Sequence, residues 1–348
     1  MREHSALKTL PDLLLPWYER HARSLPWRAD PTPYKVLVSE LMLQQTRVEA
    51  ALPYFERFVA ALPDFEALAN APEAQLMKLW QGLGYYSRAR NLQRAAQLVV
   101  QRHGGRLPAD VKALRELPGI GDYTAGAVAS IAFGLPAAAV DGNVLRVFSR
   151  LLCMEEDVAS PAVKKEVAGM VEGLMPKDRA GDFTQALMEL GATVCLPNGR
   201  PLCESCPALS LCAAAREGRQ EALPVKKEKK ARRIERKTVV LLCYGDGVAL
   251  RQRPEKGLLA GLWEPLAMQG HLSERQVREV VRDLGGSVLD MAALPKAKHV
   301  FTHVEWHMTG WRVELAQRDG LQGDWHWTSD AQRGEGYAVP SAYRAYLG

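Results

Sequence analysis

The sequence lacks the features of a secreted or membrane-inserted chain. Its first residues carry Glu3 and His4, and prolines interrupt the apolar stretch that follows, so no signal peptide is recognisable. The longest uncharged run, residues 123–140, consists mainly of Ala and Gly and contains Gly134 and Pro136, which disfavour a membrane-spanning helix. We therefore expect a cytoplasmic protein with no membrane partner.

Neither sign of charge is in large excess. The 348 residues are 47% hydrophobic and 24% charged, with a net charge of +5, which is typical of a globular protein and excludes a disordered one. The basic excess lies in one segment, residues 226–237, which holds eight Lys or Arg and two Glu. The length predicts two domains of ordinary size.

Cysteine is scarce outside one cluster. Four of the six cysteines follow the spacing C-x7-C-x2-C-x5-C, and they are Cys195, Cys203, Cys206 and Cys212. Clustered thiolates repel one another unless a cation neutralises them, which favours a metal centre over a disulfide scaffold or four unrelated buried thiols. The single C-x-x-C pair fits a [4Fe–4S] cluster about as well as structural zinc.

The hydrophobic pattern changes once along the chain. Helical spacing predicts helices over residues 33–62, 73–80, 87–103, 109–116, 123–133, 143–152, 161–174 and 178–190. Later residues predict strands over 238–244, 248–253, 298–308 and 311–316, with a helix over 273–284. The predicted fold is therefore multidomain, with an all-α domain (1–222), a basic linker (223–237) and an α+β domain (238–348).

A glycine-rich turn lies between two of the predicted helices. In Leu-Pro-Gly-Ile-Gly, Gly119 and Gly121 let backbone N–H groups approach a ligand closely, and the next helix presents an N-terminus that favours phosphate. The motif predicts a helix–hairpin–helix that grips a nucleic-acid backbone without reading bases. A tight turn between helices is the structural alternative.

Two carboxylates stand in contrasting sequence surroundings. Glu40 lies beside an apolar helical stripe, where desolvation would raise its pKa and keep the proton that a general acid needs. Asp141 begins a predicted helix, whose dipole would keep a carboxylate ionised. The alternatives are a partly exposed helical glutamate and a plain N-cap. One protonated and one ionised carboxyl group is the pattern of glycosidic bond cleavage through an oxocarbenium-like state.

These motifs occur in one order with Ser-Glu-Leu-Met-Leu-Gln-Gln-Thr (39–46), Gly-Leu-Gly-Tyr-Tyr-Ser-Arg-Ala-Arg-Asn-Leu (82–92) and Asp-Gly-Asn-Val (141–144). The series resembles the MutY family of adenine DNA glycosylases, in the helix–hairpin–helix base-excision superfamily, over nearly the whole chain. The resemblance implies removal of adenine mispaired with 8-oxoguanine or guanine in double-stranded DNA. It also implies one [4Fe–4S] cluster, held within residues 195–212, and a C-terminal domain similar to Nudix hydrolases.

The resemblance implies a role for each matching residue. Glu40 would protonate adenine at N7 and then activate water, and Asp141 would stabilise the sugar cation. Residues placed around that carboxylate are Tyr123 and Asn143. Residues that line the extruded adenine are Arg28 and Gln185, and those that wedge into the duplex and contact 8-oxoguanine are Gln45, Thr46 and Tyr85. Extrusion explains such polar and aromatic groups, because a stacked adenine hides its glycosidic bond.

A missing lysine favours simple hydrolysis. In the related endonuclease III type, a lysine after the hairpin attacks the sugar and the strand is then cut. Tyr123 occupies that position here, and a phenol cannot form a Schiff base. We predict a monofunctional glycosylase; the alternatives are a bifunctional lyase of the same fold, a non-catalytic DNA-binding iron–sulfur protein and an electron carrier.

The C-terminal domain resembles a Nudix fold that has lost its hydrolytic metal site. Residues 278–285 match the helix of a Nudix box, but Arg282 and Gly270 stand where metal-binding carboxylates are needed. We therefore predict a recognition domain.

A short segment of that domain matches a loop that contacts 8-oxoguanine, and it consists of Phe301, Thr302 and His303. Thr302 keeps a hydroxyl group where Ser is more usual, so the hydrogen bond is retained in principle. A buried strand with alternating residues is the alternative. The basic linker would add sequence-independent affinity for phosphate, form a solvated hinge or bind a protein partner. Nothing in the sequence indicates an obligate oligomer, and we expect a monomer on DNA.

Overall fold

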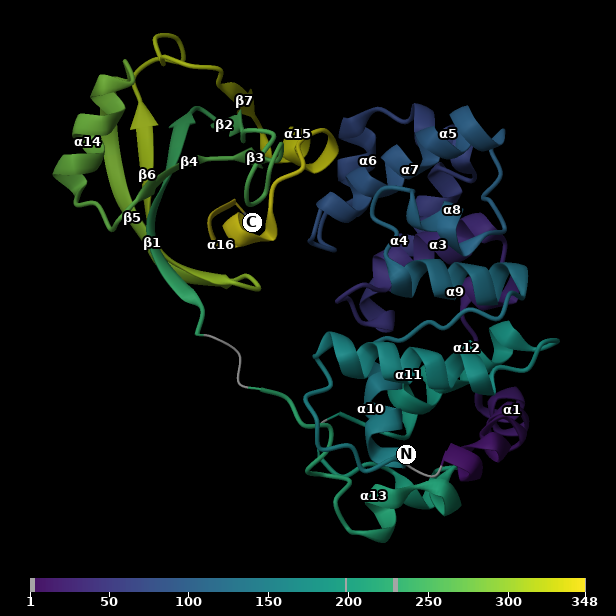
Figure 1. Ribbon diagram of the computed structural model, residues 1–348. Helices are drawn as coiled ribbons and strands as arrows, with labels where there is room; N and C mark the ends of the chain where they lie inside the picture. Colours follow the sequence, from purple (N-terminus) through teal and green to yellow (C-terminus); the bar gives the residue numbers. More distant parts are fainter. Residues whose placement is uncertain (1–3, 198, 228–230, 348) are drawn as a thin grey trace. The chain divides into compact units, whose positions relative to one another are not determined.

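The structure is a computed structural model that describes residues 4–197, 199–227 and 231–347 (Figure 1). Residues 228–230 of the predicted linker, residue 198 of the cysteine loop and the chain ends (1–3 and 348) lie outside this range. By internal contacts the described residues form two compact units, 4–70 with 90–227 and 71–89 with 231–347. No helix in the described part is long and apolar enough to span a bilayer.

The first unit is helical, as predicted. Its α-helices are α1 (Leu10–His21), α2 (Pro26–Ala29), α3 (Pro33–Leu43), α4 (Val48–Ala61), α5 (Phe65–Asn70), most of α7 (Ser87–His103), α8 (Val111–Arg115), α9 (Asp122–Phe133), α10 (Gly142–Leu151), α11 (Pro161–Leu174), α12 (Ala180–Thr193) and α13 (Ala213–Arg216). Short 3₁₀ turns cover His4–Thr9, Cys203–Ser205 and Leu209–Leu211.

Helix α10 lies in a buried core with α1 and α12. Val147 and Phe148 of α10 are almost fully buried, together with Leu14 of α1 and Phe183 of α12. Burial of such side chains contributes about 1.5–3 kcal/mol each to folding. At the beginning of α10, Asn143 lies against Gly191 near the C-terminal end of α12, and this packing fixes the N-terminus of α10, where Asp141 lies.

One predicted helix is two helices. The prediction of a continuous helix over residues 33–62 was wrong, because α3 ends at Leu43 and α4 begins at Val48. Gln45 has φ of +58°, a left-handed conformation that cannot continue a right-handed helix. The break turns Gln44 to Arg47 toward a cavity in the helical unit.

The second unit combines α6 (Glu73–Trp80) with an α+β fold, as predicted for the C-terminal region. Its strands are β1 (Arg233–Tyr244), β2 (Gly247–Gln252), β3 (Trp263–Glu264), β4 (Leu266–Gln269), β5 (Val288–Val300), β6 (Val304–Leu315) and β7 (His326–Thr328). They pair in the order β3-β2-β1-β6-β5, with β4 also beside β1 and β7 beside β2. Strands β1 and β6 are parallel, and the other described pairs are antiparallel.

The two faces of β1 bury alternate residues, as the two-residue period of a strand requires. Val240 and Leu242 pack with Val277 of α14 (Glu274–Asp283), which covers one side of the sheet in Figure 1. Val239 and Leu241 pack on the opposite face with residues of Ser341–Tyr343, a 3₁₀ turn that precedes α16 (Arg344–Leu347). The remaining helix is α15 (Asp330–Glu335).

Several boundaries of this region differ from the prediction. Strand β6 runs without a break across residues 309 and 310, where the sequence predicted two separate strands. Arg233–Lys237, predicted as the end of the linker, is the beginning of β1, because it pairs with β6. The predicted strand over residues 298–308 is interrupted at 301–303, where the Phe301 N–H donates to the Val304 carbonyl at 2.8 Å and closes a turn. The predicted hairpin between β1 and β2 is confirmed, with Tyr244 opposite Gly247.

Candidate active site

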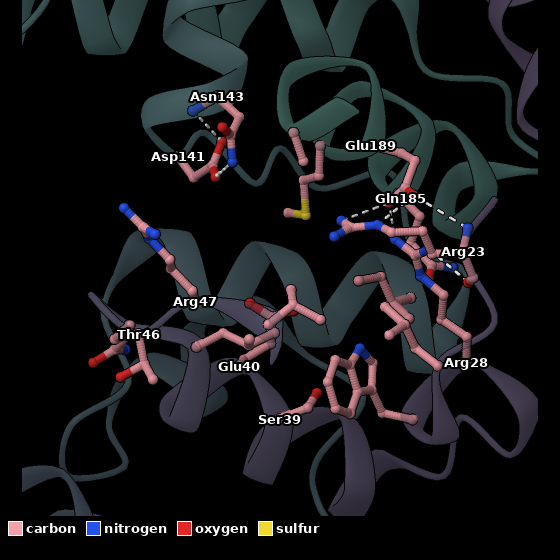
Figure 2. Close-up of a pocket in the computed structure, with 18 of the residues that line it drawn as sticks. Arg23, Arg28, Ser39, Glu40, Thr46, Arg47, Asp141, Asn143, Gln185 and Glu189 are labelled. Carbon is pink, nitrogen blue, oxygen red and sulfur yellow. Dashed lines mark hydrogen bonds and ion pairs between the residues drawn. The ribbon is translucent and has the colours of Figure 1, made fainter. Parts of the chain in front are cut away.

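A cavity of about 770 Å³ opens in the helical unit (Figure 2). Its walls come from α3 and the break after it, the start of α9, the start of α10, and α12. The structure brings eight of the predicted site residues together in this lining: Arg28, Glu40, Gln45, Thr46, Tyr123, Asp141, Asn143 and Gln185. Residues that lie 157 positions apart in the sequence thus line one space.

Glu40 meets the requirement for a proton donor. Its side chain on α3 is buried, and burial raises its pKa to about 7. The Tyr123 hydroxyl donates a hydrogen bond of 2.6 Å to Glu40 Oε2, which acts against that rise, while the nearby Asp141 charge adds to it. A carboxyl group with this pKa can both give and take a proton near neutral pH.

Asp141 is the N-cap of α10. Its Oδ1 accepts from the backbone N–H groups of Asn143 and Val144, both at 2.8 Å, and its Oδ2 accepts from the Asn143 side-chain amide at 2.6 Å. These donors favour the ionised form, but burial raises the pKa of Asp141 above its ordinary value. The prediction from the helix dipole did not include this burial, which raises the pKa of both carboxyl groups.

The carboxylates nevertheless differ in hydrogen bonding. Glu40 receives one O–H donor and Asp141 receives three N–H donors. An acceptor surrounded only by donors is suited to a negative charge that stabilises a developing cation. The site can therefore supply a proton from one wall and a counter-charge from another.

A buried ion-pair group in the cavity wall was not predicted from the sequence. Glu189 of α12 has no exposed side-chain surface and accepts from Arg28 Nη2 at 2.7 Å and from Arg23 Nε at 2.7 Å. Burial opposes its charge, but the two arginines lower the pKa of Glu189 below its ordinary value. Figure 2 shows this group beside Gln185, and Arg47 lies across the cavity near Thr46. Arg23 and Glu189 are far apart in sequence, so no local pattern indicated the pair.

Tyr85 and Thr302 meet within the second unit. The Tyr85 hydroxyl lies 2.7 Å from Thr302 Oγ1, within hydrogen-bond distance, although the residues are 217 positions apart. Tyr85 has φ of +49° and 46% of its surface exposed, an unusual combination for a large aromatic residue. Phe301 and His303 flank Thr302 in the turn between β5 and β6.

The predicted hairpin joins α8 to α9. Gly119 has φ of +80°, and a Cβ there would lie 2.7 Å from Cβ of Asn91, so only glycine fits. Gly121 is the N-cap of α9, and a methyl group added to its Cα would meet open space. The turn therefore leaves backbone room beside a helix N-terminus, as phosphate contact requires.

The four clustered cysteines lie together in the loop after α12. They are free thiols and half-buried, and burial together with the neighbouring thiols raises the pKa of Cys206 to about 12, so a bound cation is needed to hold them as thiolates. No three metal-binding side chains in the described residues converge on a single-ion site. Four thiols on one short loop are a donor set that suits either a [4Fe–4S] cluster or zinc.

Two arginines of α10 connect the active site with this loop. Arg146 donates to the Asn143 side chain at 2.8 Å and to the Cys195 carbonyl at 2.7 Å. Arg150, one turn later, donates to Cys195 Sγ at 3.2 Å and to the Leu196 carbonyl at 2.9 Å. Both guanidinium groups satisfy loop carbonyls that face the helix.

Comparison with known proteins agrees with this geometry. Residues 38–172 match the family described as HhH-GPD superfamily base excision DNA repair protein, and residues 238–348 match the NUDIX domain. A solved thermostable thymine-DNA glycosylase has 29% identity and a TM-score of 0.55, covering 62% of this chain and all of that one. The fold and the cavity therefore define a helix–hairpin–helix base-excision glycosylase with a Nudix domain.

Relatives that match most of the chain identify one family within this class of glycosylases. Adenine DNA glycosylase of Mus musculus is 37% identical over 84% of this chain and 68% of its own length. That of Schizosaccharomyces pombe is 31% identical over 84% of this chain and 78% of its own length. The chain belongs to the MutY family, the adenine DNA glycosylases of base excision repair.

Proposed function

We propose that this protein hydrolyses the N-glycosidic bond of adenine paired with 8-oxoguanine or guanine in duplex DNA and leaves an abasic site. The observation that carries the proposal is a buried Glu40, with a pKa of about 7, in the same cavity as Asp141. The carboxylates have the complementary donors that acid-assisted departure of a base requires.

The reaction begins with extrusion of the deoxyadenosine nucleotide into the cavity, since its glycosidic bond is hidden while the base is stacked in the duplex. Arg28, Gln185 and Glu189 line the space that receives the base. Protonated Glu40 donates to adenine N7, the bond to the sugar breaks, and the electron pair leaves with the base. The Asp141 carboxylate stabilises the sugar cation, and Glu40, now ionised, removes a proton from the attacking water.

A hydrolytic outcome follows from the residue after the hairpin. Tyr123 donates to Glu40 and offers no amine for a covalent sugar intermediate. Borohydride treatment during turnover should therefore give no stoichiometric, rate-competent enzyme–DNA adduct. Formation of that adduct would assign a lyase.

The decisive experiment is a single-turnover incubation with a duplex containing adenine opposite 8-oxoguanine, followed by alkali to reveal abasic sites. Glu40→Gln keeps the side-chain shape but cannot donate a carboxyl proton, so it should abolish product and largely spare binding. Glu49→Gln is the matched control, because Glu49 lines the same cavity with an exposed carboxylate and should be dispensable. Binding without release of adenine by the unsubstituted protein would refute the proposal.

We also propose that the four clustered cysteines hold one [4Fe–4S] cluster. Hydrolysis requires no electron, so the bound cluster supplies structural stabilisation of the loop that carries Arg200 rather than a chemical step. Arg146 and Arg150 would transmit that order to α10. Brown protein with visible absorbance and about four irons per chain would support the cluster, and one zinc per chain would contradict it.

Lesion recognition is assigned to Gln45, Thr46, Tyr85 and the turn at Phe301, Thr302 and His303. The bond between Tyr85 and Thr302 supports this assignment, because it aligns two hydroxyl groups from distant parts of the sequence. When the hydrogen bond between Tyr85 and Thr302 breaks, each hydroxyl can donate to or accept from the edge of a base. A preference for 8-oxoguanine over guanine that is lost in Thr302→Val would support the role.

A further inference from the structure

The turn between β5 and β6 is fastened by residues at the beginning of β1. Arg232 Nε donates to the Phe301 carbonyl at 3.1 Å, and the Arg233 backbone N–H donates to the His303 carbonyl at 3.2 Å. The carbonyl groups of the residues before and after Thr302 therefore each accept a hydrogen bond from a residue about 70 positions earlier in the sequence.

The base of the turn is attached to the same strand. The Phe301 ring packs edge-on against Trp306, with ring centroids 4.8 Å apart. The Trp306 indole N–H donates to Glu235 Oε2 at 3.1 Å, and Lys237 Nζ lies 4.6 Å from the ring centroid. These contacts hold the Phe301 side chain. The hydrogen bond from Arg232 instead holds the Phe301 carbonyl, and it is exposed to solvent.

The Phe301 carbonyl belongs to the peptide unit that precedes the Thr302 side chain. This carbonyl shares a planar peptide unit with the nitrogen of Thr302, so rotation of that plane reorients the threonine backbone. Thr302 is exposed, and its hydroxyl lies 2.7 Å from Tyr85. With its side chain unpacked, the direction of the hydroxyl depends on the backbone and on that single hydrogen bond.

We propose that Arg232 is a positioning residue that sets the discrimination between 8-oxoguanine and guanine, by fixing the Phe301–Thr302 peptide plane through its Nε–H. The proposal rests on the proposed function, in which Thr302 contacts the base opposite adenine. Its basis is a hydrogen bond in a defined direction, which distinguishes Arg232 from linker residues that add charge alone.

The test compares Arg232→Ala and Arg232→Lys with Lys227→Ala, which removes one charge from an exposed position of the same basic segment. Single-turnover rates at subsaturating enzyme are measured on duplexes with adenine opposite 8-oxoguanine and opposite guanine. Both Arg232 variants should lower the ratio of the two rates roughly fivefold, the effect of one hydrogen bond. Lys227→Ala should lower the rates on both duplexes by the same factor and leave their ratio unchanged.

Amide hydrogen exchange in the free protein provides a readout that does not depend on catalysis. Exchange at residues 301–304 should accelerate in both Arg232 variants and remain at the wild-type rate in Lys227→Ala. Unchanged exchange, or an unchanged rate ratio despite faster exchange, overturns the proposal. If the unsubstituted protein shows no preference for 8-oxoguanine, the lesion-reading function fails, and exchange still decides whether Arg232 positions the turn.

Discussion

At the scale of single residues, Glu40 shows how much a burial pattern predicts. Its apolar helical neighbours predicted desolvation, and the structure confirms a buried carboxyl with a raised pKa. The Tyr123 hydrogen bond was not predictable from local sequence, because Tyr123 lies 83 positions away on another helix. The raised pKa of Asp141 was not predictable for the same reason, because the residues that bury it belong to other segments.

The raised pKa of Glu40 makes stability dependent on pH. Below the ordinary value of 4.5 the group is protonated in the folded and unfolded states, and its burial costs little. Between 4.5 and about 7 the folded state holds a proton that the unfolded state releases, so stability falls as pH rises. Glu40→Gln should therefore increase the free energy of unfolding by up to about 3 kcal/mol at pH 8 and by little at pH 4.5.

Denaturant titrations at the two pH values check this prediction. Gln can still accept the hydrogen bond from Tyr123, so packing and polarity change little. Glu49→Gln, at an exposed side chain, provides the control and should show no pH-dependent gain. An equal effect of Glu40→Gln at pH 4.5 and pH 8 would mean that Glu40 has the same pKa in the folded and unfolded states, and it would contradict the raised pKa.

At the scale of elements, Asp141 serves both α10 and the cavity, and substitution can separate the two roles. Asn at this position keeps an oxygen that accepts from the N–H groups of Asn143 and Val144, but it loses the charge. Asp141→Asn also loses the bond from the Asn143 side-chain amide to Oδ2, so it should lower the unfolding free energy by about 1–2 kcal/mol and abolish adenine release. Asp141→Ala should lose both the cap and the activity. Near-normal turnover by Asp141→Asn would reduce Asp141 to a helix cap.

Substitutions at the two hairpin glycines should affect different properties, folding stability at Gly119 and DNA binding at Gly121. Gly119→Ala places a Cβ against Asn91 at positive φ, and it should destabilise the protein by about 1–3 kcal/mol. Gly121→Ala meets open space at negative φ, so its effect on stability should be about 1 kcal/mol or less. If the hairpin contacts phosphate, Gly121→Ala should weaken duplex binding while the melting temperature is nearly unchanged. Unaltered affinity would argue for a simple turn.

Element boundaries were predictable where sequence punctuation was strong. Helices α7 and α11 begin and end where the sequence predicted them, and the hairpin between β1 and β2 follows from Gly245 and Gly247. The break between α3 and α4 escaped prediction, because apolar residues continue at helical spacing across it. Gln45 has a left-handed backbone conformation and lines the cavity. Such a conformation depends on tertiary contacts, which the local sequence pattern does not reveal.

At the scale of the whole molecule, charge is concentrated instead of spread over the surface. Residues 226–237 carry an excess of six positive charges, more than the net charge of +5 of the entire chain. Part of this segment is strand β1, where Glu235 pairs with Arg233 at 2.5 Å and Lys237 at 3.5 Å. The described linker lysines, Lys226 and Lys227, are exposed. They are therefore suited to sequence-independent contact with phosphate.

Replacing both lysines separates affinity from catalysis. Each phosphate contact releases counterions, so Lys226→Ala with Lys227→Ala should lower the slope of log affinity against log salt by about 1.8 if both lysines contact DNA. Affinity should fall equally for duplexes with adenine opposite 8-oxoguanine or guanine, and the single-turnover rate at saturating enzyme should not change, since neither residue lines the cavity. Exposed Lys164 and Lys165 on α11 provide a charge-matched control pair. An unchanged salt slope would make the linker a solvated hinge, and a selective loss for one duplex would show that the segment also affects lesion reading.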